Sequence, residues 1–197
     1  MAGELARHDL GANPIILALP RGGLPIGLPV AEKLSAPLDI VIVRKLGVPW
    51  QPELAMGALA GTTRILDHAL IEQLRISDSD IEAVVARESK ELERREELYR
   101  GNRPAPALAG RTVILIDDGL ATGSTMLAAV RHVRAARPQK VIVAVPVASA
   151  QACGRFRKEA DECVCLATPQ PFFAVGEWYT DFRQVTDSEV QEILSRA

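Results

Sequence analysis

Two adjacent carboxylates, Asp117 and Asp118, are the side chains in this sequence whose types and surroundings best suit chemistry. They follow a largely apolar run at 112–116, which predicts a short strand buried on both faces. The segment ATGST at 121–125 comes next and leads into a helix predicted at about 125–137. Its backbone N–H groups, its hydroxyls and the positive end of the helix suit a phosphate dianion. Because paired carboxylates can accept hydrogen bonds from vicinal hydroxyls, the stretch predicts a sugar-phosphate site.

A second loop with anion-binding character follows the apolar strand predicted at 15–19. Its residues are Pro20, Arg21, Gly22 and Gly23. Two glycines after an arginine permit unusual backbone angles and the close approach of an anion. Taken alone, such a loop is more often a plain turn.

A third loop is predicted where the strand at 38–43 ends in Arg44 and Lys45. Adjacent cations followed by a glycine and two prolines predict a mobile basic loop. One interpretation is that the two cations neutralise a leaving anion. The alternative is that they are two solvated surface charges.

The stretch 113–125 resembles the PRPP-binding motif of type I phosphoribosyltransferases. That motif has four apolar residues, two acids, two mostly apolar residues, a small residue, Thr or Ser, Gly, any residue, and Thr or Ser. The sequence fits at every position but one, because Gly119 stands where the family usually has an aliphatic residue, so we expect a looser turn there. The alternative is an ordinary Asp-rich turn between a strand and a helix. The resemblance spans about 15–170 and is weaker at the other two loops.

The resemblance implies a Mg²⁺-dependent transfer of the 5-phosphoribosyl group from PRPP to a nitrogenous base, with release of pyrophosphate. It assigns the pyrophosphate to the loop at 20–23 and the catalytic roles to Asp117, Asp118, Arg44 and Lys45. Mg²⁺ would be held near the two acids through PRPP and water, with no direct protein ligand. The residues implied to bind the 5-phosphate are Ala121, Thr122, Gly123, Ser124 and Thr125.

The acceptor base is not identified by the sequence. Enzymes for 6-oxopurines usually carry an Asp at the position of Ala121 and a Lys at the position of Val147. The acidic motif and the Arg-Lys loop look more like those of adenine-type enzymes, so a purine is somewhat favoured. Five of the eight aromatic residues lie at 172–182, either as a tail pinned to the core or as a wall for the base. The candidate base pocket is Pro146, Val147, Phe172, Phe173 and Trp178.

Buried strands alternating with helical segments predict an α/β protein, as the resemblance also implies: a three-layer fold with a mostly parallel central sheet flanked by helices. We expect a single domain over 1–197, with a core at about 14–170. A helical insertion at about 67–105 and an aromatic tail with a helix at 171–197 are expected to form a small hood. The long helix from residue 77 carries a narrow apolar stripe, which faces either the core or a dimer partner. In parallel sheets the ligand lies beyond the carboxyl ends of the strands, where all three loops fall.

The composition bounds the remaining possibilities. The 197 residues carry 23 basic and 25 acidic side chains, so there is no basic excess to indicate nucleic acid as a partner. No apolar run approaches the roughly 20 residues of a membrane span, and we expect a cytoplasmic protein and a homodimer. Cys163 and Cys165 share a strand face and are predicted to be small core residues with no metal-type spacing. Competing classes are a non-catalytic protein that senses PRPP or nucleotides, and a hydrolase, which would need a water-activating group.

Overall fold

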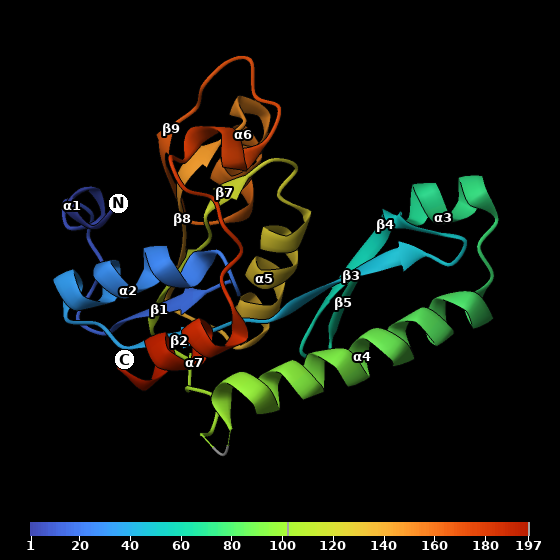
Figure 1. Cartoon of the computed structure of the whole chain (residues 1–197), viewed down its shortest axis with the longest axis horizontal. Helices are drawn as coiled ribbons and strands as arrows, with labels where there is room; N and C mark the ends of the chain where they lie inside the picture. Colours follow the sequence, from blue (N-terminus) through green and yellow to red (C-terminus); the bar gives the residue numbers. More distant parts are fainter. Residues whose placement is uncertain (102, 197) are drawn as a thin grey trace.

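The computed structural model describes residues 1–101 and 103–196. Asn102, inside the segment predicted at 67–105, and Ala197, at the end of the tail, lie outside the described residues. The chain forms an α/β core from which a long arm extends to one side (Figure 1). Within the described part of the chain, no helix has both the length and the apolar character that a membrane span requires.

The core is built on one parallel sheet. Its strands run in the order β2-β1-β6-β8-β9, and the short β7 pairs with β8 beyond the end of β6. The register aligns Ile16 with Ile114 and Ile114 with Ile142, so equivalent residues form continuous rows across the sheet. The strands are β1 (Pro14–Ala18), β2 (Leu38–Ile40), β6 (Thr112–Ile116), β7 (Gly119–Leu120), β8 (Lys140–Ala148) and β9 (Glu162–Ala167).

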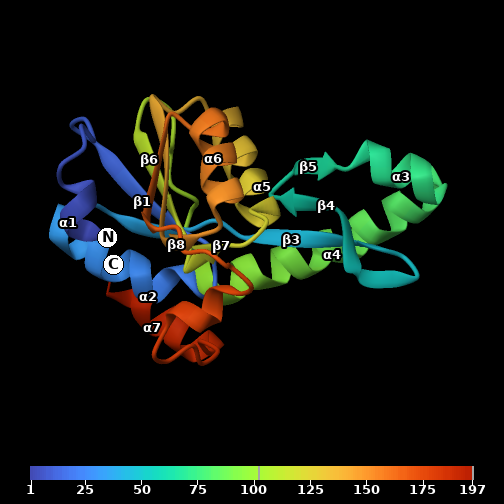
Figure 2. The same cartoon turned by 90° about the horizontal axis from the view of Figure 1, so that it is seen from above.

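Helices cover both faces of this sheet (Figure 2). Ile16 and Ile114 point to the face covered by α1 (Ala2–Leu5), α2 (Gly23–Leu34) and α7 (Asp187–Ser195). Leu17 and Leu115 point to the face covered by α5 (Ser124–Ala135) and α6 (Ala150–Glu159). Burial of one such side chain contributes about 1.5–3 kcal/mol, and every residue of β6 is buried. The three-layer α/β fold with a mostly parallel sheet is therefore confirmed.

The arm is a three-stranded antiparallel sheet crossed by a long helix. Its elements are β3 (Val43–Val48), β4 (Gln51–Ala60), β5 (Thr63–Leu66), α3 (His68–Leu74) and α4 (Asp78–Arg100). Ser77 caps α4 by accepting a hydrogen bond of 3.2 Å from the Asp80 N–H, so the helix begins where the sequence predicts. The apolar stripe of α4, represented by Val84 and Leu92, packs into the protein's own core. The core-facing alternative is thus confirmed.

The prediction of a mobile basic loop at 44–47 is wrong, because Arg44 and Lys45 lie within β3. They pair with Leu59 and Ala58 of β4 in an antiparallel register. Leu46, two residues after Arg44 and therefore on the same face of the strand, is fully buried, whereas Lys45 on the opposite face is exposed. The strand predicted at 38–43 is correspondingly divided: β2 ends at Ile40 in the main sheet and β3 begins at Val43 in the arm.

Candidate active site

The acidic pair lies at the carboxyl end of β6, the central position of the sheet. The Asp118 N–H donates a hydrogen bond of 2.9 Å to Oδ1 of Asp117. Burial raises the pKa of Asp117 well above its usual range, and the charge of Asp118 raises it further. Burial also raises the pKa of Asp118. No cation among the described residues offsets these effects, so the pair is suited to receive hydroxyl donors or a hydrated cation.

The glycine loop at 20–23 lies directly against the acidic pair. The Leu19 N–H donates a hydrogen bond of 2.8 Å to the Ile116 carbonyl, which ties the loop to the end of β6. A Cβ atom at Gly22 would collide with the Asp118 carboxylate, and one at Gly23 would lie 2.5 Å from the Ile116 oxygen. Both glycines are therefore required by close approach. The structure brings the loop and the acids together, as the sequence predicts for strand ends of one parallel sheet.

The looser turn expected at Gly119 is wrong. Gly119 and Leu120 form β7, which pairs with Val147 and Ala148 of β8. A Cβ atom at Gly119 would lie 2.6 Å from Cγ1 of Val175 in the C-terminal tail. Glycine replaces the usual aliphatic residue here because the tail occupies the space in which that side chain would lie.

The segment 121–125 forms an open helix N-terminus. Gly123 caps α5 in the left-handed region at φ 75°, and no side chain caps the helix within the described residues. The Ala121 carbonyl accepts a hydrogen bond of 2.9 Å from Ser149, while Thr122, Ser124 and the other residues except Gly123 are exposed. The hydroxyls of Thr122 and Ser124 lie 3.3 Å apart in a mutual hydrogen bond, and together with the backbone N–H groups of the segment they have the chemistry of an anion site.

The C-terminal tail supplies a wall that the motif analysis does not predict. The Tyr179 hydroxyl donates a hydrogen bond of 2.6 Å to the Asp118 carbonyl, and its ring packs on Phe182 with centroids 5.3 Å apart. A cavity of about 280 Å³ lies between this tail and the glycine loop. Its lining includes Arg21, Gly22, Asp118, Phe182, Arg183 and Val185. The cluster of aromatics at 172–182 was the available signal, but nothing in it singled out Tyr179 or Arg183.

Most of the tail's aromatic side chains are not pinned to the core. Phe173 is 76% exposed, Phe182 49% and Trp178 46%, so the prediction of a buried aromatic tail is wrong for these three residues. Among the candidate base-pocket residues, Val147 is buried under the pairing with Gly119 and Pro146 is half-buried. The tail approaches the acids through Tyr179 instead.

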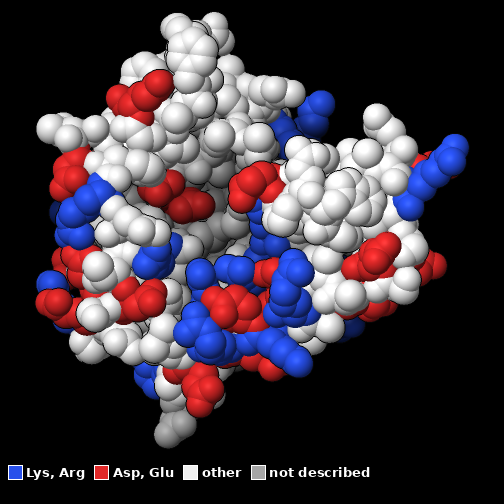
Figure 3. Space-filling view, turned by 45° about the vertical axis from the view of Figure 1, so that its right-hand side comes forward, with Lys and Arg blue, Asp and Glu red and all other residues white. Residues whose placement is uncertain are grey.

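The two predicted catalytic cations are held apart from the acidic pair by ion pairs in the arm. Arg44 donates hydrogen bonds of 2.7 and 3.0 Å to Glu88 of α4, and Arg87 donates one of 3.0 Å to the same carboxylate. Lys45 pairs with Glu53 at 3.1 Å. Figure 3 shows a hollow between core and arm, with Lys and Arg side chains gathered around acidic ones at its lower rim.

We expect Asp117→Asn to raise the stability of the free protein at neutral pH. The native carboxyl has a raised pKa, so it binds more protons than the unfolded one, and stability falls as pH rises above about 4. The amide removes this cost, about 1.4 kcal/mol per unit of pKa shift, and can still accept the Asp118 N–H. Thermal melting from pH 4 to 8 should show an advantage of at least about 1 kcal/mol at pH 7.5 that shrinks toward pH 4. Parallel melting curves for the two proteins would contradict the assignment.

These features define a class of protein. Residues 1–180 match the family described as "Phosphoribosyl transferase domain", and the chain therefore belongs to that family. Proteins of two Mycobacterium tuberculosis strains, CDC 1551 and H37Rv, which carry provisional names as phosphoribosyl transferases, are 45% identical to this chain over 188 residues. The match covers 95% of this chain and 42% of the relatives, so the chain spans less than half of their length.

Two solved structures share the fold of this chain. The protein TT1426 from Thermus thermophilus is 44% identical with a TM-score of 0.84, over 99% of this chain and 92% of that one. A Neisseria gonorrhoeae protein has a TM-score of 0.51 at 12% identity, over 99% of this chain and 87% of that one. The second likeness shows the fold alone.

Proposed function

We propose that this protein transfers the 5-phosphoribosyl group of PRPP to a nitrogenous base and releases pyrophosphate, with Mg²⁺ as cofactor. The observation that carries the proposal is the close packing of the glycine loop on the acidic pair, where a Cβ atom at Gly22 would displace the Asp118 carboxylate. The reaction needs such a contact, because C1 of the ribose carries the pyrophosphate while C2 and C3, the next two carbons of the ring, carry the hydroxyls. Membership of the family supports the same assignment.

In this proposal each loop holds one part of PRPP. The 5-phosphate binds the segment 121–125 at the N-terminus of α5, and the ribose hydroxyls donate hydrogen bonds to Asp117 and Asp118. The pyrophosphate binds the backbone of the loop at 20–23 beside Arg21. The bond from C1 to the pyrophosphate oxygen breaks with its electron pair on that oxygen. A nitrogen of the base forms the new bond to C1 and releases its N–H proton to the departing pyrophosphate or to water.

The catalytic contribution of the chain is electrostatic and positional. The two carboxylates fix the ribose and face the positive charge that develops on it as the bond to pyrophosphate breaks. The tail at 179–185 shields the site from water, which would otherwise compete with the base for C1. Tyr179 positions this tail through its hydrogen bond to the Asp118 carbonyl.

The acidic pair also fits Mg²⁺. Two carboxylates with raised pKa values and no compensating cation among the described residues are hard oxygen donors, the type that Mg²⁺ prefers. Asp117 and Asp118 would hold the ion through water and PRPP oxygens. When bound, Mg²⁺ supplies positive charge that stabilises the leaving pyrophosphate.

Arg44 and Lys45 are proposed to neutralise the pyrophosphate, which requires Arg44 to leave Glu88. We therefore expect Arg44→Ala to lower turnover about tenfold, or about 1.4 kcal/mol of transition-state stabilisation. Glu88→Gln removes the charge that holds Arg44 in the arm and keeps the arginine itself. This variant should therefore retain wild-type turnover or exceed it. Steady-state rates and melting temperatures of both variants separate catalysis from folding. Equal rates in Arg44→Ala and wild type would exclude the role.

The proposed acceptor is a purine-type base. The residues that the sequence predicts for its pocket are Pro146, Val147, Phe172, Phe173 and Trp178. Phe182 lines the cavity beside the acids and packs on Tyr179, so we propose these two as additional wall residues. We propose that the exposed rings become covered when the base binds, because stacking on a base would bury their apolar surface.

Isothermal titration with PRPP, with and without Mg²⁺, tests the proposal. Magnesium-dependent binding followed by pyrophosphate release with a purine would support it. Tight PRPP binding with no turnover across a panel of purines and pyrimidines would favour the sensing function instead. If millimolar PRPP does not bind, both functions are excluded.

A further inference from the structure

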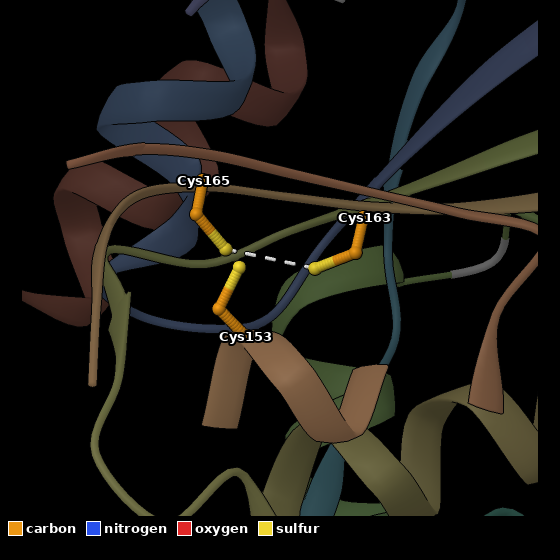
Figure 4. Close-up of side chains that lie close together, drawn as sticks. All are labelled: Cys153, Cys163 and Cys165. Atoms are coloured by element: carbon orange, nitrogen blue, oxygen red, sulfur yellow. Dashed lines mark hydrogen bonds between the residues drawn. The ribbon is translucent and has the colours of Figure 1, made fainter. Parts of the chain in front are cut away.

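Three free cysteines meet between α6 and β9 (Figure 4). In the sheet, β8 separates β9 from β6, the strand that precedes the acidic pair. Cys153 lies on α6 and is only 4% exposed, whereas Cys163 and Cys165 lie on β9 and are half-buried. Their three sulfur atoms all lie within 4.8 Å of one another, and those of Cys163 and Cys165 are 3.6 Å apart. The sequence predicts the shared strand face of the last two, but it gives no indication of the third.

The distances between the three sulfur atoms match those expected around a bound metal ion. A Zn–S bond of about 2.3 Å places the sulfurs of a tetrahedral or trigonal site about 3.8–4.0 Å apart. The observed separations, from 3.6 Å to at most 4.8 Å, bracket this value. A disulfide would need a sulfur–sulfur distance of about 2.05 Å, and all three thiols are free, so each sulfur is available as a ligand.

We propose that Cys153, Cys163 and Cys165 bind a thiophilic metal ion with filled d orbitals, Zn²⁺ or Cu⁺. Thiolates select such ions over Mg²⁺, which takes oxygen ligands, so this site is chemically separate from the proposed magnesium position. Two of the three ligands are half-buried on an edge strand, and this gives the ion a path of entry. Zn²⁺ would take water as its fourth ligand, while Cu⁺ would be satisfied by three sulfurs.

The bound ion would join α6 to β9 at a point that supports the predicted phosphate segment. Ser149, which precedes α6, donates to the Ala121 carbonyl, and Phe156 of α6 fills the space beside Gly123. Cys153 lies between these two residues, about one turn from each. Metal binding should therefore stiffen the support of that segment and raise the melting temperature, whether or not the protein turns over PRPP.

The test uses the full chain, reduced and stripped of metal, titrated with Zn²⁺ against a chromophoric chelator and separately with Cu⁺ without oxygen. We expect one ion per chain with a Kd below about 1 µM for at least one of the two ions, and a rise in melting temperature. Cys153→Ser and Cys163→Ser should each weaken binding at least tenfold. Val164→Ala, between the two strand cysteines but on the opposite face, is the packing control and should bind like wild type.

Three results would overturn the proposal. The first is that the folded wild-type protein binds neither ion, which would make the cluster ordinary packing. The second is that Cys153→Ser, folded by circular dichroism, keeps wild-type affinity, since the site would then use only the strand pair. The third is a disulfide in freshly isolated protein, seen as a mass lower by two hydrogens, that re-forms in air even when metal is supplied.

Discussion

Asp118→Asn should reduce turnover with PRPP about 10- to 100-fold while leaving the protein folded. The substitution replaces a charged acceptor of ribose hydroxyl hydrogen bonds with a neutral one, and each such charge-assisted bond is worth about 1.5–3 kcal/mol. It also removes a negative charge opposite the oxocarbenium-like ribose. Because burial raises the pKa of Asp118 in the free protein, the neutral amide should not lower stability. Initial rates at saturating PRPP and base measure the effect.

The matched control is Asp78→Asn, which makes the same charge change at an exposed position in the first turn of α4. That variant should keep wild-type rates. Titration of Asp118→Asn with PRPP at fixed Mg²⁺ tells whether the loss occurs in binding or in turnover. A purified, folded Asp118→Asn variant with wild-type rates would remove Asp118 from the site.

Gly123→Ala should weaken PRPP binding about 10- to 100-fold, because it would disturb the backbone N–H groups that are proposed to receive the 5-phosphate. Gly123 has φ 75°, where a side chain costs about 1 kcal/mol or more, and its new Cβ would collide with the Phe156 ring. Relief of the collision must move the segment or the ring, so the N–H groups lose their common direction. Titration calorimetry with PRPP measures the affinity.

Gly154→Ala is the control for this experiment, since a Cβ atom there would meet no atom within 4 Å and the residue lies in the regular helix α6. It should bind PRPP like wild type and melt at the same or a slightly higher temperature. Inorganic phosphate used as a competitor gives a second measurement, because it should protect wild type against thermal unfolding more than Gly123→Ala. Unchanged PRPP affinity in the glycine variant would place the 5-phosphate elsewhere.

Folding and binding place opposed demands on the acidic pair. Asp117 and Asp118 are held in surroundings that favour their neutral forms, and the charged forms become favourable only when hydroxyls or a cation are present. The free protein therefore carries a cost that binding would relieve. The same reasoning explains why Asp117→Asn is expected to stabilise the protein while abolishing the proposed ribose contact.

The sequence alone determined the features that depend on neighbouring residues. Residues 112–135 contain, in one continuous stretch, the strand, the two acids, the small-residue turn and the helix. Because these parts are adjacent in sequence, the sequence alone predicts that they are adjacent in space. Ser77, Ser149 and Thr186 were predictable as helix caps because each bonds an N–H only three residues away. The convergence of the loops at 20–23 and 117–125 also followed, because parallel strands end at the same edge.

Only the tertiary structure decided the features whose partners are distant in the chain. Periodicity tells which face of a segment is apolar, but not what covers that face, so the stripe of α4 could be placed against the core only by the fold. The sequence predicted Arg44 in a loop, but the pairing of β3 with β4 and the ion pair with Glu88 of α4 place it in a strand. Tyr179 lies 61 residues from the carbonyl that it bonds, and Cys153 meets its two partners only because α6 packs on β9. No local pattern encodes such pairs, because the free energy that selects them comes from burial over the whole core.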